Sequence, residues 1–197
     1  MIFQCLEFIQ RAENLKNTLR FSNTSAGRAE STAEHTWRLC LMVMVFADEF
    51  KQADMVKMLK MCVIHDLGEA IHGDIPAISQ DNPGKSESER RDFLDLVGVL
   101  PLHIRTEFLA LWDDYEHALS YEARLVKGLD KLETIIQHNQ ALDVTGIDYV
   151  FNLEYGKRYM DAHPLFEVLR GMVDKDTASR VDGEPPPAQV DSTDMQY

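Results

Sequence analysis

A histidine and an aspartate, His65 and Asp66, stand side by side at the end of an apolar stretch of the sequence. The preceding residues 61–64 are methionine, cysteine, valine and isoleucine, which favours burial. A buried carboxylate without a partner costs several kcal/mol, and a divalent cation would serve as a partner for both side chains. The doublet therefore predicts a metal site at the end of a helix expected over residues 53–67.

Two further residues could complete such a site from other segments. His35 stands near the start of a predicted helix, and Asp130 interrupts an otherwise apolar helical face. Two imidazoles and two carboxylates form a mixed nitrogen and oxygen donor set, which suits Mn, Fe, Co, Ni or Zn and not a thiolate site. Each residue alone is more often structural, as a hydrogen-bonded histidine or a salt-bridged aspartate. Their joint occurrence on three successive helical segments favours the metal site.

Two more acids stand close to the doublet. Glu69 follows His65 by four residues, so both side chains share one helical face, and Asp74 follows a glycine that can turn the chain back. Beside a metal already neutralised by carboxylates, extra acids are unfavourable unless one of them handles a proton. A divalent ion lowers the pKa of its bound water, which gives a nucleophile near neutral pH. The other interpretation of these acids is a solvated helix end with its cap.

The elements that must position these residues carry a helical pattern almost throughout. Apolar side chains recur at spacings of three and four, and no convincing alternation of period two indicates a strand. Ser31 and Glu34 form a capping-box pattern at the start of the helix that carries His35. We therefore expect an all-α protein, a helical bundle of six to eight helices in a single domain over residues 1–173.

Three stretches depart from the helical pattern. Residues 21–30 and 73–86 are rich in Gly, Ser, Asn and Pro, which predicts loops that are either functional or disordered. Residues 174–197 are acidic, contain a run of prolines and have almost no apolar side chains. This composition predicts a disordered tail.

The overall composition limits the class of partner. The 197 residues include 33 acidic and 20 basic side chains, which give a formal net charge of −13. Such a field repels nucleic-acid polymers and anionic membranes, but it does not exclude a small phosphate-bearing substrate. No apolar run approaches the ~20 residues of a membrane span. Three widely spaced cysteines favour free thiols in a reducing compartment, and the amino terminus has no basic leader pattern, so we expect a cytoplasmic protein.

Longer strings around the candidate residues resemble one protein family. The order His, His-Asp, Asp resembles the HD-domain metal-dependent phosphohydrolases, an all-helical superfamily. The flanking residues resemble its 5'-deoxynucleotidase branch, which includes bacterial 5'-nucleotidases and a human HD-domain-containing protein. The similarity covers residues 15–143. It is carried by Leu15-Lys16 with Arg20, by residues 30–38 (ESTAEHTWR), 65–70 (HDLGEA) and 73–76 (GDIP), and by residues 127–133 (KGLDKLE).

The resemblance implies roles for these positions. It implies one divalent transition metal ion, either Co, Mn, Zn, Ni or Fe, and four ligands to it: His35, His65, Asp66 and Asp130. It implies that Arg20 orients the substrate phosphate with paired guanidinium donors, which a lysine could not match. It also implies that Glu69 and Asp74 are the catalytic residues beside the metal.

The resemblance further implies where the substrate lies. Phe21 stands where this branch often has a tryptophan, and it keeps an aromatic face for the nucleoside. The loop implied to touch the nucleoside comprises Asp74, Ile75, Pro76 and Ala77. The implied reaction is removal of the 5'-phosphate from (deoxy)nucleoside monophosphates, and a homodimer is implied for the assembly.

Two alternatives to this activity stay open. The first is an HD phosphohydrolase that acts on another nucleotide, such as a triphosphate, an alarmone or a cyclic dinucleotide. It is disfavoured because the sequence has no second His-Asp doublet and little basic clustering apart from Arg90 and Arg91. The second is a non-catalytic module that metal binding stabilises. The presence of Glu69 and Asp74 argues against it.

Overall fold

The computed structural model describes residues 1–74, 84–142 and 144–183. Within these ranges the chain forms nine α-helical segments, of which seven have 10 to 20 residues, so the all-α expectation is confirmed. The helices are α1 (Ile2–Ala12), α2 (Thr32–Val45), α3 (Met55–Ile64), α4 (Glu69–His72), α5 (Lys85–Val97), α6 (Leu102–His117), α7 (Tyr121–Gln140), α8 (Tyr149–Glu154) and α9 (Pro164–Val181). Two 3-10 turns, η1 (Glu13–Lys16) and η3 (Lys157–Ala162), precede the first strand and follow α8. No helix among the described residues is long and apolar enough to cross a membrane.

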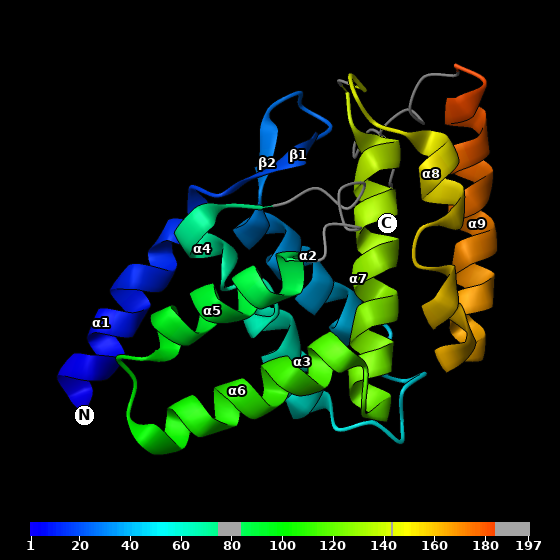
Figure 1. Ribbon diagram of the computed structural model, residues 1–197. Coiled ribbons are helices and arrows are strands. Elements are labelled where there is room, and N and C mark those ends of the chain that lie inside the picture. Colours follow the sequence, from blue (N-terminus) through cyan, green and yellow to red (C-terminus); the bar gives the residue numbers. More distant parts are fainter. Residues whose placement is uncertain (75–83, 143, 184–197) are drawn as a thin grey trace, which may run out of the picture.

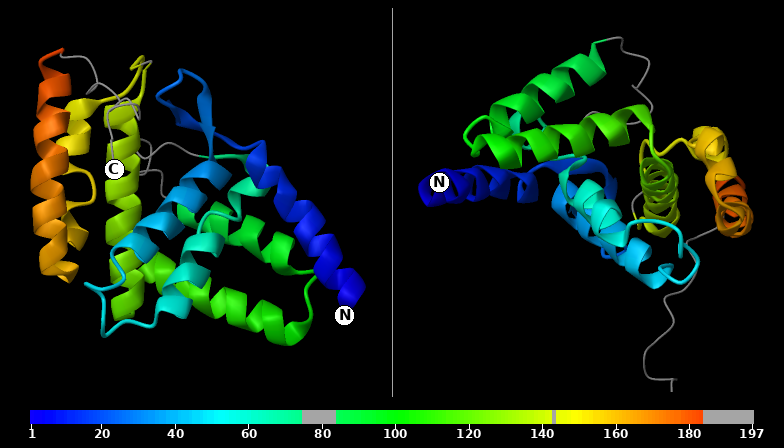
Figure 2. Two further views of the ribbon diagram at one scale, coloured as in Figure 1. Left: turned by 180° about the vertical axis from the view of Figure 1, so that it is seen from behind. Right: turned by 90° about the horizontal axis from the view of Figure 1, so that it is seen from below.

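The long helix α7 lies at the centre of the fold (Figure 1). Helices α2 and α3 pack against α7 and against each other, and α6 joins them. Helix α9 packs along α7 from the other side, with α8 and η3 beside it (Figure 2). Buried side chains of α7, such as Leu125, Leu129 and Leu132, form the middle of the larger hydrophobic cluster. A second hydrophobic cluster is formed by side chains that include those of α1, α5 and α6.

A short antiparallel hairpin corrects the expectation of a loop without strands over residues 21–30. Strand β1 (Leu19–Asn23) pairs with β2 (Ala29–Ser31), with Leu19 opposite Ser31 and Asn23 opposite Ala29, and the register between these pairs is irregular. Strands of five and three residues are too short for alternating polarity to stand out from a sequence. The hairpin leads directly into α2, where Ser31 and Glu34 form the expected capping box.

The folded chain also extends further than expected. Helix α9 continues to Val181, so the predicted boundary at residue 174 is wrong for the first part of the tail. Two buried polar side chains hold this last stretch of helix to α7. Thr177 accepts a hydrogen bond from the Asn139 amide at 2.9 Å, and Arg180 donates to the Ala141 carbonyl at 3.0 Å. Residues 184–197 of the predicted tail lie outside the described residues.

Candidate metal centre and active-site cavity

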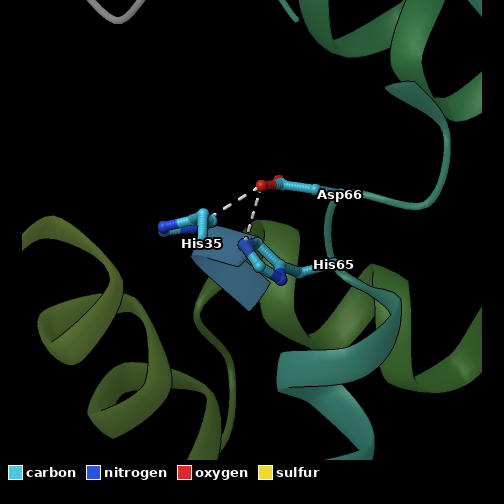
Figure 3. Close-up of side chains that lie close together, drawn as sticks. All are labelled: His35, His65 and Asp66. Carbon is cyan, nitrogen blue, oxygen red and sulfur yellow. Dashed lines mark ion pairs between the residues drawn. The ribbon is translucent and has the colours of Figure 1, made fainter. Parts of the chain in front are cut away.

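Three of the four predicted ligands meet where the start of α2 faces the end of α3 (Figure 3). His35 lies in the first turn of α2, and His65 and Asp66 directly follow α3. Asp66 Oδ2 lies 3.0 Å from His65 Nε2 and 3.7 Å from His35 Nε2. The potential ligand atoms of these residues all lie within 4.8 Å of one another, so this group could hold a metal ion.

Asp130 reaches the same point from the middle of α7. Its Oδ1 lies 3.2 Å from His35 Nε2 and 4.0 Å from His65 Nε2. Its Oδ2 accepts a hydrogen bond from the Tyr115 hydroxyl at 2.7 Å and lies 2.8 Å from Lys131 Nζ. One carboxylate oxygen is thus held by the surrounding side chains while the other faces the two histidines.

Both imidazoles are arranged with a ring nitrogen available for a cation. His35 Nδ1 is hydrogen bonded to Glu133 Oε2, and His65 Nδ1 donates to the Cys62 carbonyl at 2.8 Å. When Nδ1 carries the proton, the lone pair of a neutral imidazole is on Nε2. The Nε2 atoms of both rings are buried and make no hydrogen bond. Two such nitrogens next to two carboxylates fit a divalent cation.

The electrostatics of the cluster favour added positive charge. Burial and Arg20 oppose the charged form of His35, but the carboxylates of Glu133 and Asp130 outweigh them and raise its pKa to about 10. Burial likewise opposes ionisation of Asp66, yet the neighbouring histidines hold its pKa well below the usual range. The protein alone therefore stabilises a proton among these groups. A bound cation would take over that stabilising role.

Glu133 is a positioning residue that the sequence analysis missed. It is fully buried on α7, and its other oxygen, Oε1, accepts from Arg38 Nε at 2.5 Å. The residue follows Asp130 by three positions, so both side chains share one face of the helix. That spacing is the signal that could have identified it. The hydrogen bond from His35 Nδ1 to Glu133 thus fixes the orientation and the tautomer of the His35 ring.

Replacing Glu133 with glutamine is expected to weaken metal binding about 10- to 100-fold, because His35 loses the carboxylate that orients it. A competition titration with a metal chelator would measure the change. Glu107→Gln, an exposed glutamate that pairs with Lys60, is the matched control and should leave the affinity unchanged. Equal affinities of the Glu133→Gln variant and the wild-type protein would contradict this role.

Arg20 lies on β1 beside the cluster. Its Nη1 is 3.7 Å from Asp66 Oδ2, and its Nη2 donates to Thr134 Oγ1 at 3.2 Å. Burial opposes its charge, but Asp74 and Asp66 outweigh burial and raise its pKa further. Its Nε atom is buried without a hydrogen bond, although Glu30 Oε2 lies 3.5 Å away. The guanidinium thus stays charged at the edge of the candidate metal centre.

The structure describes both predicted acids, Glu69 and Asp74, but only one residue of the predicted nucleoside loop. Glu69 begins α4 and is buried, and its Oε2 accepts from Thr32 Oγ1 at 3.0 Å. Burial, with Asp66 and Asp74, raises the pKa of Glu69 well above its ordinary value. Asp74 lines the same cavity as Glu69. The other three predicted loop residues lie outside the described residues: Ile75, Pro76 and Ala77.

A cavity of about 400 Å³ joins these side chains to a second group that the sequence analysis did not single out. Three candidate ligands, Arg20 and the two acids line it. Phe151 of α8, Tyr155 just after that helix and Tyr159 of η3 also line it. Phe21 is half exposed and lines this cavity as well. The volume is in the range of small-molecule sites.

His138 of α7 lines the same cavity and predicts a pH dependence of stability. Its Nδ1 lies 3.0 to 3.2 Å from the side-chain amide of Asn152, and burial lowers its pKa to about 4. A histidine held neutral in the folded state takes up a proton first in the unfolded state. Its contribution to the free energy of unfolding is therefore fully present above its unfolded pKa near 6.5. This contribution, about 3 kcal/mol, is lost as pH falls toward 4.

Urea unfolding between pH 7 and about 4.5, in the presence of a chelator, would measure this loss. The His138→Gln variant should show a shallower decline of unfolding free energy than the wild-type protein. Parallel curves for the two proteins would show that His138 titrates normally.

Comparison with known proteins identifies the family. Residues 12–167 match the HD domain family. Over 145 residues the chain is 34% identical to 5'-deoxynucleotidase HDDC2 of Homo sapiens, a match that covers 71% of this chain and 69% of the relative. The chain belongs to the HD domain family, which confirms the resemblance found in the sequence.

Two solved structures share the fold. A predicted metal-dependent phosphohydrolase from Magnetospirillum magnetotacticum MS-1 is 23% identical, with a TM-score of 0.79 over 94% of this chain and 98% of that one. The HD phosphohydrolase DatZ of cyanophage S-2L, bound to dA and one catalytic Zn²⁺ ion, is 17% identical, with a TM-score of 0.59 over 89% of this chain and 96% of that one. At these identities the likeness concerns the fold alone.

Proposed function

We propose that this protein is a metal-dependent phosphohydrolase that removes the 5'-phosphate from deoxynucleoside monophosphates, giving a nucleoside and phosphate. The observation that carries the proposal is the pair of buried, unbonded Nε2 atoms of His35 and His65 next to two carboxylates and Arg20. A cavity of about 400 Å³ opens beside them. The human relative is named a 5'-deoxynucleotidase, and the fold neighbour DatZ was solved with dA and Zn²⁺.

The proposed ligands are those expected from the sequence: His35, His65, Asp66 and Asp130. They would hold one divalent ion of Mn, Fe, Co, Ni or Zn, which acidifies water and so supplies a nucleophile near neutral pH. The availability of each metal in the cell decides which one is bound, since affinity follows the general divalent order. A cytoplasmic location and a homodimer stay predictions.

Arg20 and the two acids complete the proposed mechanism. Arg20 binds the phosphoryl oxygens and offsets the charge that develops on them during displacement. Burial beside Asp66 and Asp74 raises the pKa of Glu69 well above its ordinary value, and its Oε2 accepts from Thr32, so we assign to Oε1 the donation of a proton to the departing 5' oxygen. Asp74 accepts the proton released by the attacking water. The sequence left the two acids interchangeable, and this assignment of their roles is part of the proposal.

Phosphate release from a small set of nucleotides tests the proposed activity. In the presence of Mn, Co or Zn, deoxyribonucleoside 5'-monophosphates of several bases should be hydrolysed, whereas 3'-dAMP should be a poor substrate because the metal and Arg20 fix the phosphate end. AMP should be slower than dAMP by about ten- to a hundredfold, because a 2'-hydroxyl left unpaired beside an apolar wall costs ~1–3 kcal/mol.

The outcomes separate the alternatives that the sequence left open. Equal efficiency for AMP and dAMP would contradict deoxynucleotide selectivity. Turnover of a triphosphate or a cyclic dinucleotide, with no monophosphate hydrolysed, would favour another HD phosphohydrolase. No phosphate release from any nucleotide would leave a non-catalytic, metal-stabilised module.

A further inference from the structure

One wall of the cavity is aromatic and comes from outside the helices that carry the candidate ligands. Phe151 lies in α8, Tyr155 follows the end of that helix and Tyr159 lies in η3. All three line the cavity. The ring centroids of Phe151 and Tyr155 are 5.3 Å apart, with an angle of 31° between the ring planes. The two rings lie next to each other at the cavity, and the mechanism proposed above uses neither of them.

Lys131 lies close to both the aromatic wall and the candidate metal centre. Its Nζ lies 2.8 Å from Asp130 Oδ2 and 5.2 Å from the centre of the Tyr155 ring. A single ammonium group therefore lies close to both a candidate ligand and a ring of the aromatic wall. In a nucleotide, one sugar separates the phosphate from the base, and this spacing suits a phosphate at the ligands with a base at the wall.

Glycines allow this close arrangement of the backbone. Gly156 has a φ of +75°, and a Cβ there would lie 2.5 Å from Lys131 Cβ. Gly146 has a φ of +81°, and a Cβ there would lie 2.6 Å from Phe21 Cζ. The backbone thus approaches Phe21 closely at Gly146 and Lys131 closely at Gly156. Only a residue without a side chain fits at either position.

Two polar side chains of this region are engaged with the protein. The amide of Asn152 pairs with His138 Nδ1, and the guanidinium of Arg170 donates to the Asn152 and Leu153 carbonyls. Flat aromatic rings favour recognition of a base by its face. Stacking of this kind tolerates different bases, because every base has a π face.

We propose that Phe151 and Tyr155 form the nucleobase subsite of this enzyme and hold the base by stacking. The proposal rests on the proposed function, because it takes the phosphate end of the cavity as given. It predicts that the base contributes to binding through the area of its rings. Purine nucleotides should then bind more tightly than pyrimidine nucleotides, without a requirement for one hydrogen-bonding pattern.

The test compares dAMP with 2-deoxyribose 5-phosphate, which keeps the sugar and the phosphate but has no base. In Phe151→Leu and Tyr155→Leu, kcat/KM for dAMP should fall about tenfold or more, as expected for the loss of one stacking partner. In both variants kcat/KM for 2-deoxyribose 5-phosphate should stay close to the wild-type value. Tyr155→Phe keeps the ring and should retain turnover of dAMP. Phe3→Leu, an exposed residue of α1, is the matched control.

The outcomes distinguish failure of the subsite from failure of the proposed function. Equal losses for both substrates would show that the two rings only support the fold, and unchanged dAMP kinetics would show that the base does not contact them. Either result overturns the subsite while leaving the activity in place. A wild-type protein that hydrolyses neither substrate would overturn the proposed function and the subsite with it. Calorimetric binding of deoxyadenosine, about tenfold or more weaker in Phe151→Leu, supports the subsite without relying on turnover.

Discussion

Replacing His65 or Asp66 with alanine is expected to abolish phosphate release and to remove the bound metal at the same time. Each change deletes one of four proposed ligands, and the remaining donors cannot complete the coordination. The loss of Asp66 also removes a carboxylate that lies 3.0 Å from His65 Nε2 and 3.7 Å from His35 Nε2. Metal content measured by mass spectrometry on each purified variant, together with phosphate release from dAMP, would check this prediction.

His72→Ala is the matched control for the loss of an imidazole. The His72 side chain is 72% exposed and pairs with Asp92, away from the candidate ligands. This variant should keep its metal and its activity. The assignment of the ligands is wrong if His65→Ala and Asp66→Ala both retain the metal content of the wild-type protein.

Arg20→Lys is expected to lower kcat/KM for dAMP about ten- to a hundredfold, while metal content stays unchanged. Lysine keeps the positive charge but is a point charge, so it cannot offer paired donors at a fixed geometry to two phosphoryl oxygens. A charged hydrogen bond of this kind contributes ~1.5–3 kcal/mol. Steady-state kinetics with dAMP would measure the loss.

Arg28→Lys provides the comparison within the same hairpin region. Arg28 is exposed and pairs with Glu34. Its replacement should leave kcat/KM at the wild-type value. Normal kinetics for Arg20→Lys would place Arg20 among the structural ion pairs with Glu30 and Asp66 and would remove it from the proposed phosphate site.

The residues of the candidate metal centre could be predicted because each stands out from its surroundings in the sequence. His65 and Asp66 end an apolar segment, and Asp130 interrupts one. A helical pattern with a capping box placed His35 at the start of α2, where it lies in the structure. The meeting of these residues required the packing of α2, α3 and α7 against one another, which spacing alone does not specify.

The side chains around the centre were harder to predict because their roles depend on tertiary contacts. Tyr115 comes from the preceding helix, α6, and donates a hydrogen bond to Asp130. Glu133 and Lys131 look like ordinary charged residues of a solvated helix until the neighbouring elements bury them. The aromatic wall was hard to predict for a similar reason. Phe151 and Tyr155 are four residues apart, which is also the spacing of an ordinary core-facing helix. Short strands such as β1 and β2 carry too few residues for a periodic signal.

The central claim is that this site hydrolyses deoxynucleotides with one bound metal ion per chain. A titration of chelator-treated protein with Mn²⁺ or Co²⁺, with phosphate release from dAMP as the readout, tests this claim most directly. We expect negligible activity at the start, a rise in proportion to added metal and saturation at one ion per chain, with no rise in Asp66→Ala. Full activity of the metal-free protein, or no hydrolysis of dAMP at any metal content, would contradict it.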